Sequence, residues 1–502
     1  MDKIGIFDFG GQYCHLIARR IRDLGVYAEI IYEPSPDYAG FILSGGPGNV
    51  SEDDSPQLPR KFFNDVSVPV LGICYGHQMI AQSLGGTVEK GKEREYGKKI
   101  ATLDTSSPLF KNLKQKEQVW MSHYDQIITL PSNFENIGST DSCPIASYQN
   151  PYENFYGVQF HPEVKHTING DVILDNFLNI IGCKREWKLN KWIDSKIQEL
   201  HSAIGSKRVI MAVSGGVDST VAAALLNKAD IDAHFIHVDT GLMRLNESFE
   251  VTNIFNDLGT ENLHVVDASN RFLEKLGEVS DPEQKRKIIG NLFIDIFEEE
   301  AEKLGDFDFL GQGTIYPDRI ESAEPSKHAN VIKTHHNVGG LPERMKLGLI
   351  EPLNELYKDE VREIGTMLGL PEKFINRHPF PGPALAIRIL GKVSEERVSI
   401  LRQADAIVTE IIEEKGIYNT LWQAFPALIP VKSVGVMGDK RTYEYIITIR
   451  AVESVDAMTA DWARLDYEIL EEISSNIINR VEGVNRVLYD ITSKPPGTIE
   501  YE

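Results

Sequence analysis

The chain has 502 residues, of which 42% are hydrophobic and 25% are charged, and its formal net charge is −22. A chain of this length exceeds one hydrophobic core and predicts about three globular domains. The acidic balance disfavours nucleic acid as a partner, no apolar run has membrane-spanning length, and the four cysteines match neither a disulfide framework nor a zinc site. Because the chain opens without a secretory signal, we expect a cytoplasmic protein that acts on small molecules.

The first part of the chain, residues 1–186, alternates short apolar runs with helical segments. The predicted strands are KIGIFDF, FILSGG, VPVLGIC and YGVQF, and the predicted helices are QYCHLIARRIRDLG, HQMIAQSLG and DVILDNFLNII. This alternation is typical of an α/β layer fold. An amphipathic segment at residues 185–205 predicts a helix that begins a new unit.

Residues 187–378 repeat the alternation and predict a second α/β domain with a parallel sheet. The predicted strands are RVIMAVSGG, AHFIHVD, NLHVVDAS and DFLGQGT, and the predicted helices are VAAALLNKA, NESFEVTNIFNDLG and residues 281–305. After the proline cluster HPFPGPA, residues 379–502 carry helices and strands in blocks, which predicts an α+β domain. The expected fold class is therefore α/β, with two parallel-sheet domains and a smaller C-terminal domain.

In the stretch VPVLGICYGHQ, Cys74 follows a strand and precedes a helix, with Gly72 and Gly76 on either side. Small neighbours permit a strained turn there, and a helix N-terminus stabilises a thiolate, as in a nucleophile elbow. A single cysteine is more often a small core residue, so Cys74 is a candidate nucleophile only if a base is present. The stretch GVQFHPEV supplies His161 and Glu163, which project to one face of a strand.

An earlier glycine turn, SGGPGN at residues 44–49, offers backbone N–H groups after a predicted strand. Gly46 and the amide of Tyr75 are therefore candidate donors to an oxyanion. Together, SGGP, GxCxGxQ and HPE resemble the class I glutamine amidotransferases over residues 1–183. A free-standing cysteine hydrolase of the same fold is the alternative.

The resemblance implies that Cys74 attacks the side-chain amide of glutamine, forms a thioester and releases ammonia, while His161 moves the proton. It also implies that three residues hold the glutamine substrate: Gln78 in the helix after the cysteine, and His123 and Asp125 in the stretch SHYD.

A second strand-to-helix turn, SGGVDST at residues 214–220, carries two glycines and several short polar side chains. Backbone N–H groups converge on an anion at such a turn, and the helix adds its positive end. An acid aimed at phosphates is expected mainly where Mg²⁺ lies between them. The turn is neither a GxxxxGK[ST] loop nor a GxGxxG turn. The predicted phosphate-binding residues are Ser214, Gly215, Gly216, Val217, Asp218, Ser219 and Thr220.

The turn resembles the PP-loop of the N-type ATP pyrophosphatases, which transfer AMP from ATP to an acceptor. In the following strand end, HVDTGLMR, such domains hold adenine through backbone contacts, which implicates Val238. The resemblance implies that Asp218 and Asp239 bind Mg²⁺, although Asp239 is equally explained as an ordinary residue at a helix start.

Several segments after residue 280 indicate the acceptor. The segments GQGTIYPDRIESA, IKTHHNVGGLPERMKLGLIEPL, RHPFPGPALAIR and SKPPGTIEYE together resemble the glutamine-hydrolysing GMP synthetases over essentially the whole chain. This family adenylates xanthosine 5′-monophosphate (XMP) on its C2 oxygen, after which ammonia displaces AMP and GMP forms. Cations suit the phosphate of XMP. The residues implied to bind XMP are Arg286, Arg388, Lys494, Ile499 and Glu500.

Further expectations come from the same resemblance. The C-terminal domain forms a homodimer contact in this family. The stretch IKTHHNVGG predicts a lid that carries Lys333, His335 and His336 before a Gly-Gly hinge, and adjacent histidines point apart and so disfavour a metal site. Two positions depart from the pattern: Arg319 replaces an expected hydrophobic residue and Ala384 an expected glycine. The alternatives are an amidotransferase with another adenylated acceptor, such as an NAD synthetase, and a catalytically idle nucleotide-binding scaffold.

Overall fold

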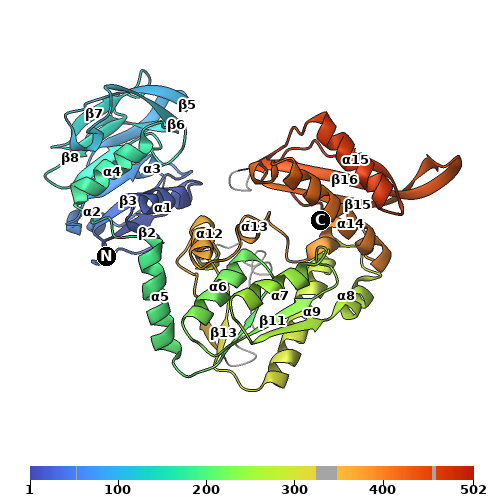
Figure 1. The fold of residues 1–502 in the computed structure, drawn as a ribbon. Coiled ribbons are helices and arrows are strands. Elements are labelled where there is room, and N and C mark those ends of the chain that lie inside the picture. Colours follow the sequence, from blue (N-terminus) through green and yellow to red (C-terminus); the bar gives the residue numbers. More distant parts are fainter. Residues whose placement is uncertain (53, 324–346, 455–458) are drawn as a thin grey trace. The chain divides into compact units, whose positions relative to one another are not determined.

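The computed structural model describes residues 1–52, 54–323, 347–454 and 459–502, and the chain forms two compact units, Met1–Trp192 and Ile193–Glu502 (Figure 1). The boundary lies inside helix α5 (Leu189–Ile204), a little beyond the predicted limit at residue 186. Trp187 explains the difference, because its ring packs 4.8 Å from that of Tyr27 and its backbone N–H donates to Gly25.

The first unit contains a nine-stranded sheet whose order is β2-β1-β3-β4-β9-β8-β7-β5-β6. Its first five strands are parallel, and they are nearly continuous apolar runs because both faces are covered. These strands are β1 (Lys3–Phe7), β2 (Tyr27–Ile31), β3 (Gly40–Leu43), β4 (Val70–Ile73) and β9 (Phe155–Val158). The helices of this unit are α1 (Cys14–Asp23), α2 (Arg60–Asp65), α3 (Tyr75–Ser83) and α4 (Gly170–Ile181).

The other four strands of this sheet are antiparallel, and the sequence analysis predicted none of them. They are β5 (Thr87–Leu103), β6 (Lys116–Thr129), β7 (Glu135–Ser139) and β8 (Ser147–Asn150). The sequence of β5, TVEKGKEREYGKKIATL, is rich in charge and lacks an apolar run, so it resembles a solvated loop. Long pairing with β6 makes it a strand, and the first sheet is mixed rather than purely parallel.

The second unit begins with a five-stranded parallel sheet in the order β12-β11-β10-β13-β14. The strands are β10 (Val209–Ala212), β11 (Ala233–Asp239), β12 (Leu263–Asp267), β13 (Phe309–Gly311) and β14 (Gly348–Ile350). The helices are α6 (Val217–Lys228), α7 (Glu247–Asp257), α8 (Ser269–Leu276), α9 (Pro282–Leu304), α10 (Tyr316–Ala323), α12 (Lys358–Met367) and α13 (Glu372–Ile375). The strand order reverses at β10, and ligands of such sheets bind at the carboxyl ends of the strands beside that point.

A smaller sheet follows, in which β16 pairs with β15, β17 and β18. Its strands are β15 (Gln423–Met437), β16 (Lys440–Ser454), β17 (Ala460–Trp462) and β18 (Val484–Tyr489), and its helices are α14 (Glu395–Glu414) and α15 (Tyr467–Arg480). One hydrophobic cluster includes Ile236 and Leu292 from the first part of the unit and Ile407 and Ile447 from the second. This shared core joins both parts into one compact unit, and a separate domain from residue 379 stays a prediction.

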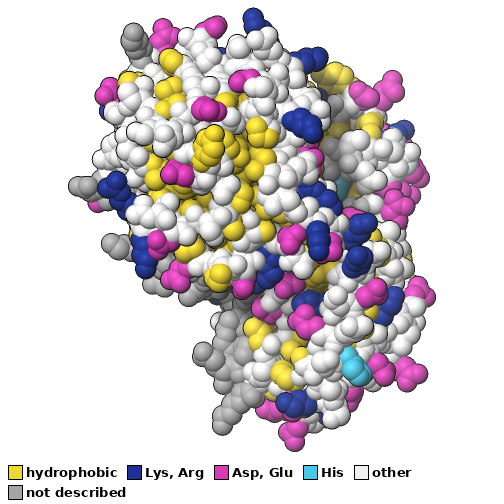
Figure 2. All heavy atoms as spheres, turned by 90° about the vertical axis from the view of Figure 1, so that its left-hand side faces the viewer, with side chains coloured by type: hydrophobic (Ala, Val, Ile, Leu, Met, Phe, Trp, Pro, Cys, Tyr) yellow, Lys and Arg dark blue, Asp and Glu magenta, His cyan; other side chains and the backbone are white. Residues whose placement is uncertain are grey.

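Figure 2 shows one face of the molecule. Acidic and basic side chains are interspersed over it, and hydrophobic side chains gather near the middle of its upper part. Interspersed charges of both signs produce no large single-sign field on the face that is drawn. Across the described ranges, no helix combines the length and the apolar character that a membrane crossing requires.

Candidate active site

Three neighbouring parallel strands, β3, β4 and β9, end at the same edge of the first sheet. The residues that follow them are the glycine turn after Leu43, Cys74, and the segment that contains His161. A β-carbon added to Gly45 would lie 3.1 Å from Cε1 of His161 and 3.7 Å from Cβ of Cys74. The three motifs that the sequence analysis combined therefore meet at one place.

Cys74 has φ 52° and ψ −102°, a conformation that costs a non-glycine residue about 1–3 kcal/mol. The flanking glycines serve close packing. A β-carbon on Gly72 would lie 2.5 Å from the carbonyl oxygen of Gly76, and one on Gly76 would lie 2.3 Å from that of Leu43. The strain is concentrated on the cysteine itself, as in a nucleophile elbow.

His161 and Glu163 form a buried pair beside this turn. Nδ1 of His161 lies 2.7 Å from Oε1 of Glu163, and Glu163 is fully buried. Burial by itself lowers the pKa of His161, but the Glu163 carboxylate and the Cys74 thiol outweigh it and raise the pKa well above its usual value. The imidazole is thus held between the carboxylate and the thiol, with its charged form favoured.

The proposed oxyanion donors lie on both sides of Cys74. Tyr75 is the first residue of α3, so its N–H has no acceptor within the helix. A β-carbon on Gly46 would lie 2.7 Å from the carbonyl oxygen of Phe9, which leaves no room for a larger residue. The roles of Gly46 and Tyr75 in binding an oxyanion stay predictions.

Gln78 connects the expected glutamine-binding segment to the nucleophile. Its Nε2 donates to the carbonyl oxygen of Asp125 at 2.7 Å and to Oε1 of Gln159 at 3.0 Å. Nε2 of Gln159 lies 3.6 Å from Sγ of Cys74, and the Cys74 thiol lies 3.8 Å from the carbonyl oxygen of Ser122. Sequence analysis missed Gln159, although its position two residues before the base in VQFHP places both side chains on one face.

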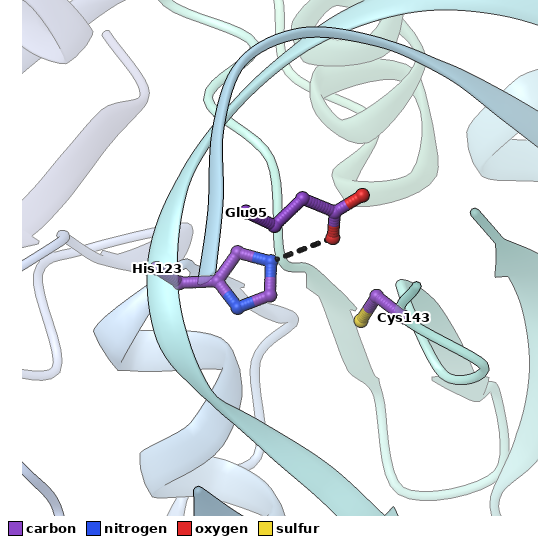
Figure 3. A group of neighbouring side chains, drawn as sticks. All are labelled: Glu95, His123 and Cys143. Carbon is purple, nitrogen blue, oxygen red and sulfur yellow. Dashed lines mark hydrogen bonds and ion pairs between the residues drawn. The ribbon is translucent and has the colours of Figure 1, made fainter. Parts of the chain in front are cut away.

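His123 lies deeper in the same unit, on β6. Its Nδ1 is 2.9 Å from the carbonyl oxygen of Asp125, and its Nε2 is 3.1 Å from Oε2 of Glu95 on β5 (Figure 3). Burial raises the pKa of the Asp125 carboxyl. The sequence analysis also missed Glu95, which lies in a highly charged segment. The structure thus groups Gln78, His123 and Asp125, and their contact with glutamine stays a prediction.

The predicted ATP loop joins β10 to α6 in the second unit. Gly215 has φ +79°, which requires glycine, and Gly216 precedes the helix in an extended conformation. The hydroxyl of Ser214 accepts from the N–H of Gly216 at 3.2 Å. The hydroxyls of Ser219 and Thr220 donate to the carbonyl oxygen of Gly216 at 3.1 and 3.0 Å. The loop is therefore internally braced at the topological switch point of the sheet.

Two acids near this loop have different partners. Both carboxylate oxygens of Asp218 lie 2.6 Å from Nζ of Lys358, at the start of α12. Asp239 ends β11, and its two oxygens accept from the N–H of Gly241 and the hydroxyl of Ser248, both at 2.9 Å. Carboxylates suit Mg²⁺, and Asp218 already faces a cation, although metal binding by either acid stays a prediction. Lys358 carries no motif that would have identified it.

The residues expected to bind XMP divide into two groups. Arg388 is fully buried and donates to Glu500 at 2.9 and 3.1 Å. Arg286 donates to the carbonyl oxygen of Glu502 at 2.6 Å, and the carbonyl oxygen of Ile499 accepts from a buried arginine of β16. These contacts gather four of the five residues around the last four residues of the chain. The fifth, Lys494, lies earlier in the same segment SKPPGTIEYE and pairs through its backbone with Ala460 of β17.

Lys285 is a buried cation beside the C-terminal end of the chain. Its side chain is completely buried on α9, pairs with Glu502, and donates to the carbonyl oxygens of Ile389 at 2.7 Å and Ala386 at 3.1 Å. The partner lies 217 residues later in the chain, so no local pattern indicates the pair.

Two segments that precede the C-terminal sheet contact the carboxyl edge of the five-stranded sheet. The backbone N–H of Leu385 donates to Leu242, and Arg402 of α14 donates to the carbonyl oxygens of Gly241 and Met243. These acceptors follow Asp239 directly. The segment Ala384–Arg388 and helix α14 are therefore hydrogen-bonded to the chain that leaves the carboxyl end of β11.

The predicted lid residues differ from the two departures from the family pattern in whether the structure describes them. Lys333, His335 and His336, the predicted lid residues, lie outside the described residues. Arg319 is exposed on α10, and Ala384 has φ +54°, a conformation that favours glycine.

Known proteins match the chain along its full length. Residues 5–181 match the family "Glutamine amidotransferase class-I", and residues 410–501 match "GMP synthase C terminal domain". Relatives named "GMP synthase [glutamine-hydrolyzing]" from Brachyspira hyodysenteriae, Symbiobacterium thermophilum and Clostridium botulinum are 51%, 52% and 52% identical, over 100% of this chain and 99% of each relative. With its three site motifs assembled as described above, the chain belongs to the family of glutamine-hydrolysing GMP synthases.

Proposed function

We propose that this chain converts XMP, ATP, glutamine and water to GMP, AMP, pyrophosphate and glutamate, with the Cys74 site as the source of ammonia. The observation that carries this proposal is the geometry of Cys74. A strained cysteine precedes a helix next to a buried His161–Glu163 pair, in a chain that also has a glycine turn between β10 and α6 at a sheet switch point.

In the glutaminase reaction, Sγ of Cys74 attacks the side-chain carbonyl carbon of glutamine. The N–H groups of Gly46 and Tyr75 stabilise the oxyanion, and His161 delivers a proton to the departing ammonia. Water, deprotonated by His161, then hydrolyses the thioester to glutamate. Glu163 fixes the orientation of the imidazole throughout, since the two side chains lie 2.7 Å apart.

In the synthetase reaction, the C2 oxygen of XMP attacks the α-phosphorus of ATP and pyrophosphate leaves. Ammonia then adds at C2 and expels AMP. The braced loop from Ser214 to Thr220 binds the phosphates, and Val238 contacts adenine. Asp218 and Asp239 would hold Mg²⁺, which neutralises phosphate charge when bound. Arg286, Arg388, Lys494, Ile499 and Glu500 are proposed to bind or order the site for XMP.

A test of this proposal follows pyrophosphate release by the full chain with Mg·ATP and glutamine, with and without XMP. We expect release that requires XMP, together with AMP and GMP. Release without XMP, or formation of ADP in place of AMP, would contradict the synthetase assignment, and deamido-NAD would then be the next acceptor to supply.

We further propose that the protein acts in the cytoplasm as a homodimer joined through the C-terminal region. Two features support the proposal: all four cysteines are unpaired, as is usual in a reducing compartment, and several hydrophobic side chains of β15 and β16 are exposed. Sedimentation of the purified chain would give its oligomeric state directly.

A further inference from the structure

We propose that Glu95 is a positioning residue for the glutaminase reaction, and that it acts through His123 on the segment that holds glutamine. This inference rests on the proposed function of Cys74. Glu95 makes no contact with the nucleophile itself, and its influence is transmitted by a series of buried hydrogen bonds.

Glu95 reaches its position because of an irregularity in the sheet. It is the cross-strand partner of His123, and a bulge between Lys90 and Glu95 on β5 shifts the pairing just before it. Bulges redirect side chains, and this one places a carboxylate inside the unit with 1% of Glu95 exposed. A buried charge is costly unless it is paired and hydrogen-bonded, so this placement requires compensation.

That compensation comes from three donors. Oε1 of Glu95 accepts from the hydroxyls of Thr140 and Ser142, both at 2.8 Å, and Oε2 lies 3.1 Å from Nε2 of His123. Burial would raise the pKa of Glu95, but these hydrogen bonds, the one from His123 foremost, lower it below the usual value. Glu95 is therefore an ionised carboxylate that fixes the imidazole (Figure 3).

His123 passes this constraint on. Its two ring nitrogens both face acceptors, the Glu95 carboxylate and the carbonyl oxygen of Asp125. The Glu95 carboxylate therefore fixes the orientation of the ring, and removal of this carboxylate leaves Nε2 of His123 without its partner.

The carbonyl oxygen of Asp125 is the junction with the catalytic centre. It accepts from His123 and also from Gln78, and Gln78 donates to Gln159, whose amide lies 3.6 Å from Sγ of Cys74. The same segment reaches Sγ directly through Ser122. Movement of the segment therefore changes both the substrate pocket and the surroundings of the thiol.

The same side chains, with Cys143, place three possible metal-ligand atoms within 4.8 Å of one another. Their chemistry favours the ion pair. Both oxygens of Glu95 and both nitrogens of His123 already have partners, and burial raises the pKa of the Cys143 thiol to about 12, which keeps it neutral and a weak ligand.

The test compares Glu95→Gln with Glu93→Gln, an exposed glutamate of the same bulge, in the full chain. For Glu95→Gln we expect kcat/KM for glutamine to fall by about tenfold to 100-fold, chiefly through a higher KM. GMP formation from ammonium should change by less than about twofold, because the synthetase site does not use this segment. Glu93→Gln should leave both activities unchanged. Loss of the function proposed above would instead show as failure of the unmodified chain to make GMP.

A structural role would give different results. Under our proposal, Glu95→Gln keeps the native rate of proteolysis of the first unit. In the double variant, Glu95→Gln also reduces kcat/KM for glutamine little beyond the reduction caused by His123→Asn, because both substitutions break the same series of hydrogen bonds. Full glutamine activity in Glu95→Gln, faster proteolysis that accounts for the loss, or additive effects in the double variant would overturn the proposal.

Discussion

The two units differ in which charged side chains are paired near their predicted sites. At the Cys74 site, the paired groups are buried and lie beside the nucleophile or the segment next to it, such as His161 with Glu163 and His123 with Glu95. In the second unit, groups expected to meet ligands are held by the protein's own opposite charges. Asp218 pairs with Lys358, and Arg388 pairs with Glu500.

The difference corresponds to the substrates. The side chain of glutamine that reacts is neutral, so a site with internally balanced charges can accept it without rearranging ion pairs. ATP and XMP are anions, and an unpaired buried cation waiting for them would cost several kcal/mol. Internal counter-ions remove that cost in the free protein, and they imply that ligand binding in the second unit exchanges one ion pair for another.

The largest effect should come from Cys74→Ala, which separates the two units. Glutamine-dependent GMP formation is expected to fall by at least about 10⁴-fold, since no other group can form the thioester. GMP formation from added ammonium should stay near the original rate, because the second unit needs only ammonia. Cys183→Ala, at a partly exposed cysteine, is the matched control. If ammonium fails to support GMP formation in Cys74→Ala, the division of labour between the units is wrong.

Arg388→Met tests the internal counter-ions of the second unit. It leaves Glu500 without its cation, while the buried Asp405 keeps Arg244 as a partner, and removal of one partner from a buried pair costs about 3–5 kcal/mol of unfolding free energy. The measurement is denaturant unfolding, with the KM for XMP as a second quantity that should rise as the tail loosens. Arg480→Met breaks an exposed pair with Glu410 and should cost less than about 1 kcal/mol. Equal losses of unfolding free energy in the two variants would show that the buried pairs of Arg388 stabilise the fold no more than an exposed pair.

Glu163→Gln tests the buried His161–Glu163 pair of the first unit through the pH dependence of the unfolding free energy. The folded pKa of His161 is raised, so protonation of His161 stabilises the fold fully below its unfolded pKa of about 6.5 and this contribution is lost as pH rises through the folded pKa. The difference in unfolding free energy between the original chain and Glu163→Gln should therefore be largest below about pH 6.5. It should decrease as the pH rises through the folded pKa of His161. Unfolding curves across this range measure it, with Glu93→Gln as a control whose difference stays flat. A gap that widens with pH would contradict the raised pKa.

The sequence predicted the parts of the molecule in which chemistry and local geometry coincide. Cys74, His161 and Gly215 lie within three residues of the ends of apolar strands, so their place at a sheet edge follows from strand order and spacing. The sequence did not predict side chains whose partners lie far away in the chain. Glu95 is buried because a bulge on β5 redirects it, and Lys358 reaches Asp218 from 140 residues away.

Lys285 shows the same limit most plainly. In DPEQKRKIIGNLF it begins a basic run that is typical of a solvated face, and only the return of the C-terminal tail supplies Glu502 as its counter-ion. Burial of a charge is decided by a tertiary partner, which periodicity and composition do not encode.

The smallest expected effect concerns Ala384, which the sequence marked as a departure because glycine was expected there. Its φ of +54° strains an alanine by about 1–2 kcal/mol, while its buried methyl group contributes about 0.8 kcal/mol. In Ala384→Gly these effects oppose each other, so the unfolding free energy should change by less than about 1 kcal/mol. Ala386→Gly, two residues later and equally buried, relieves no strain and loses its methyl group as well as backbone rigidity, which should cost about 1–2 kcal/mol. Denaturant unfolding of the two variants side by side measures the difference, and an Ala384→Gly chain as unstable as Ala386→Gly would mean that the left-handed backbone at this turn carries no strain.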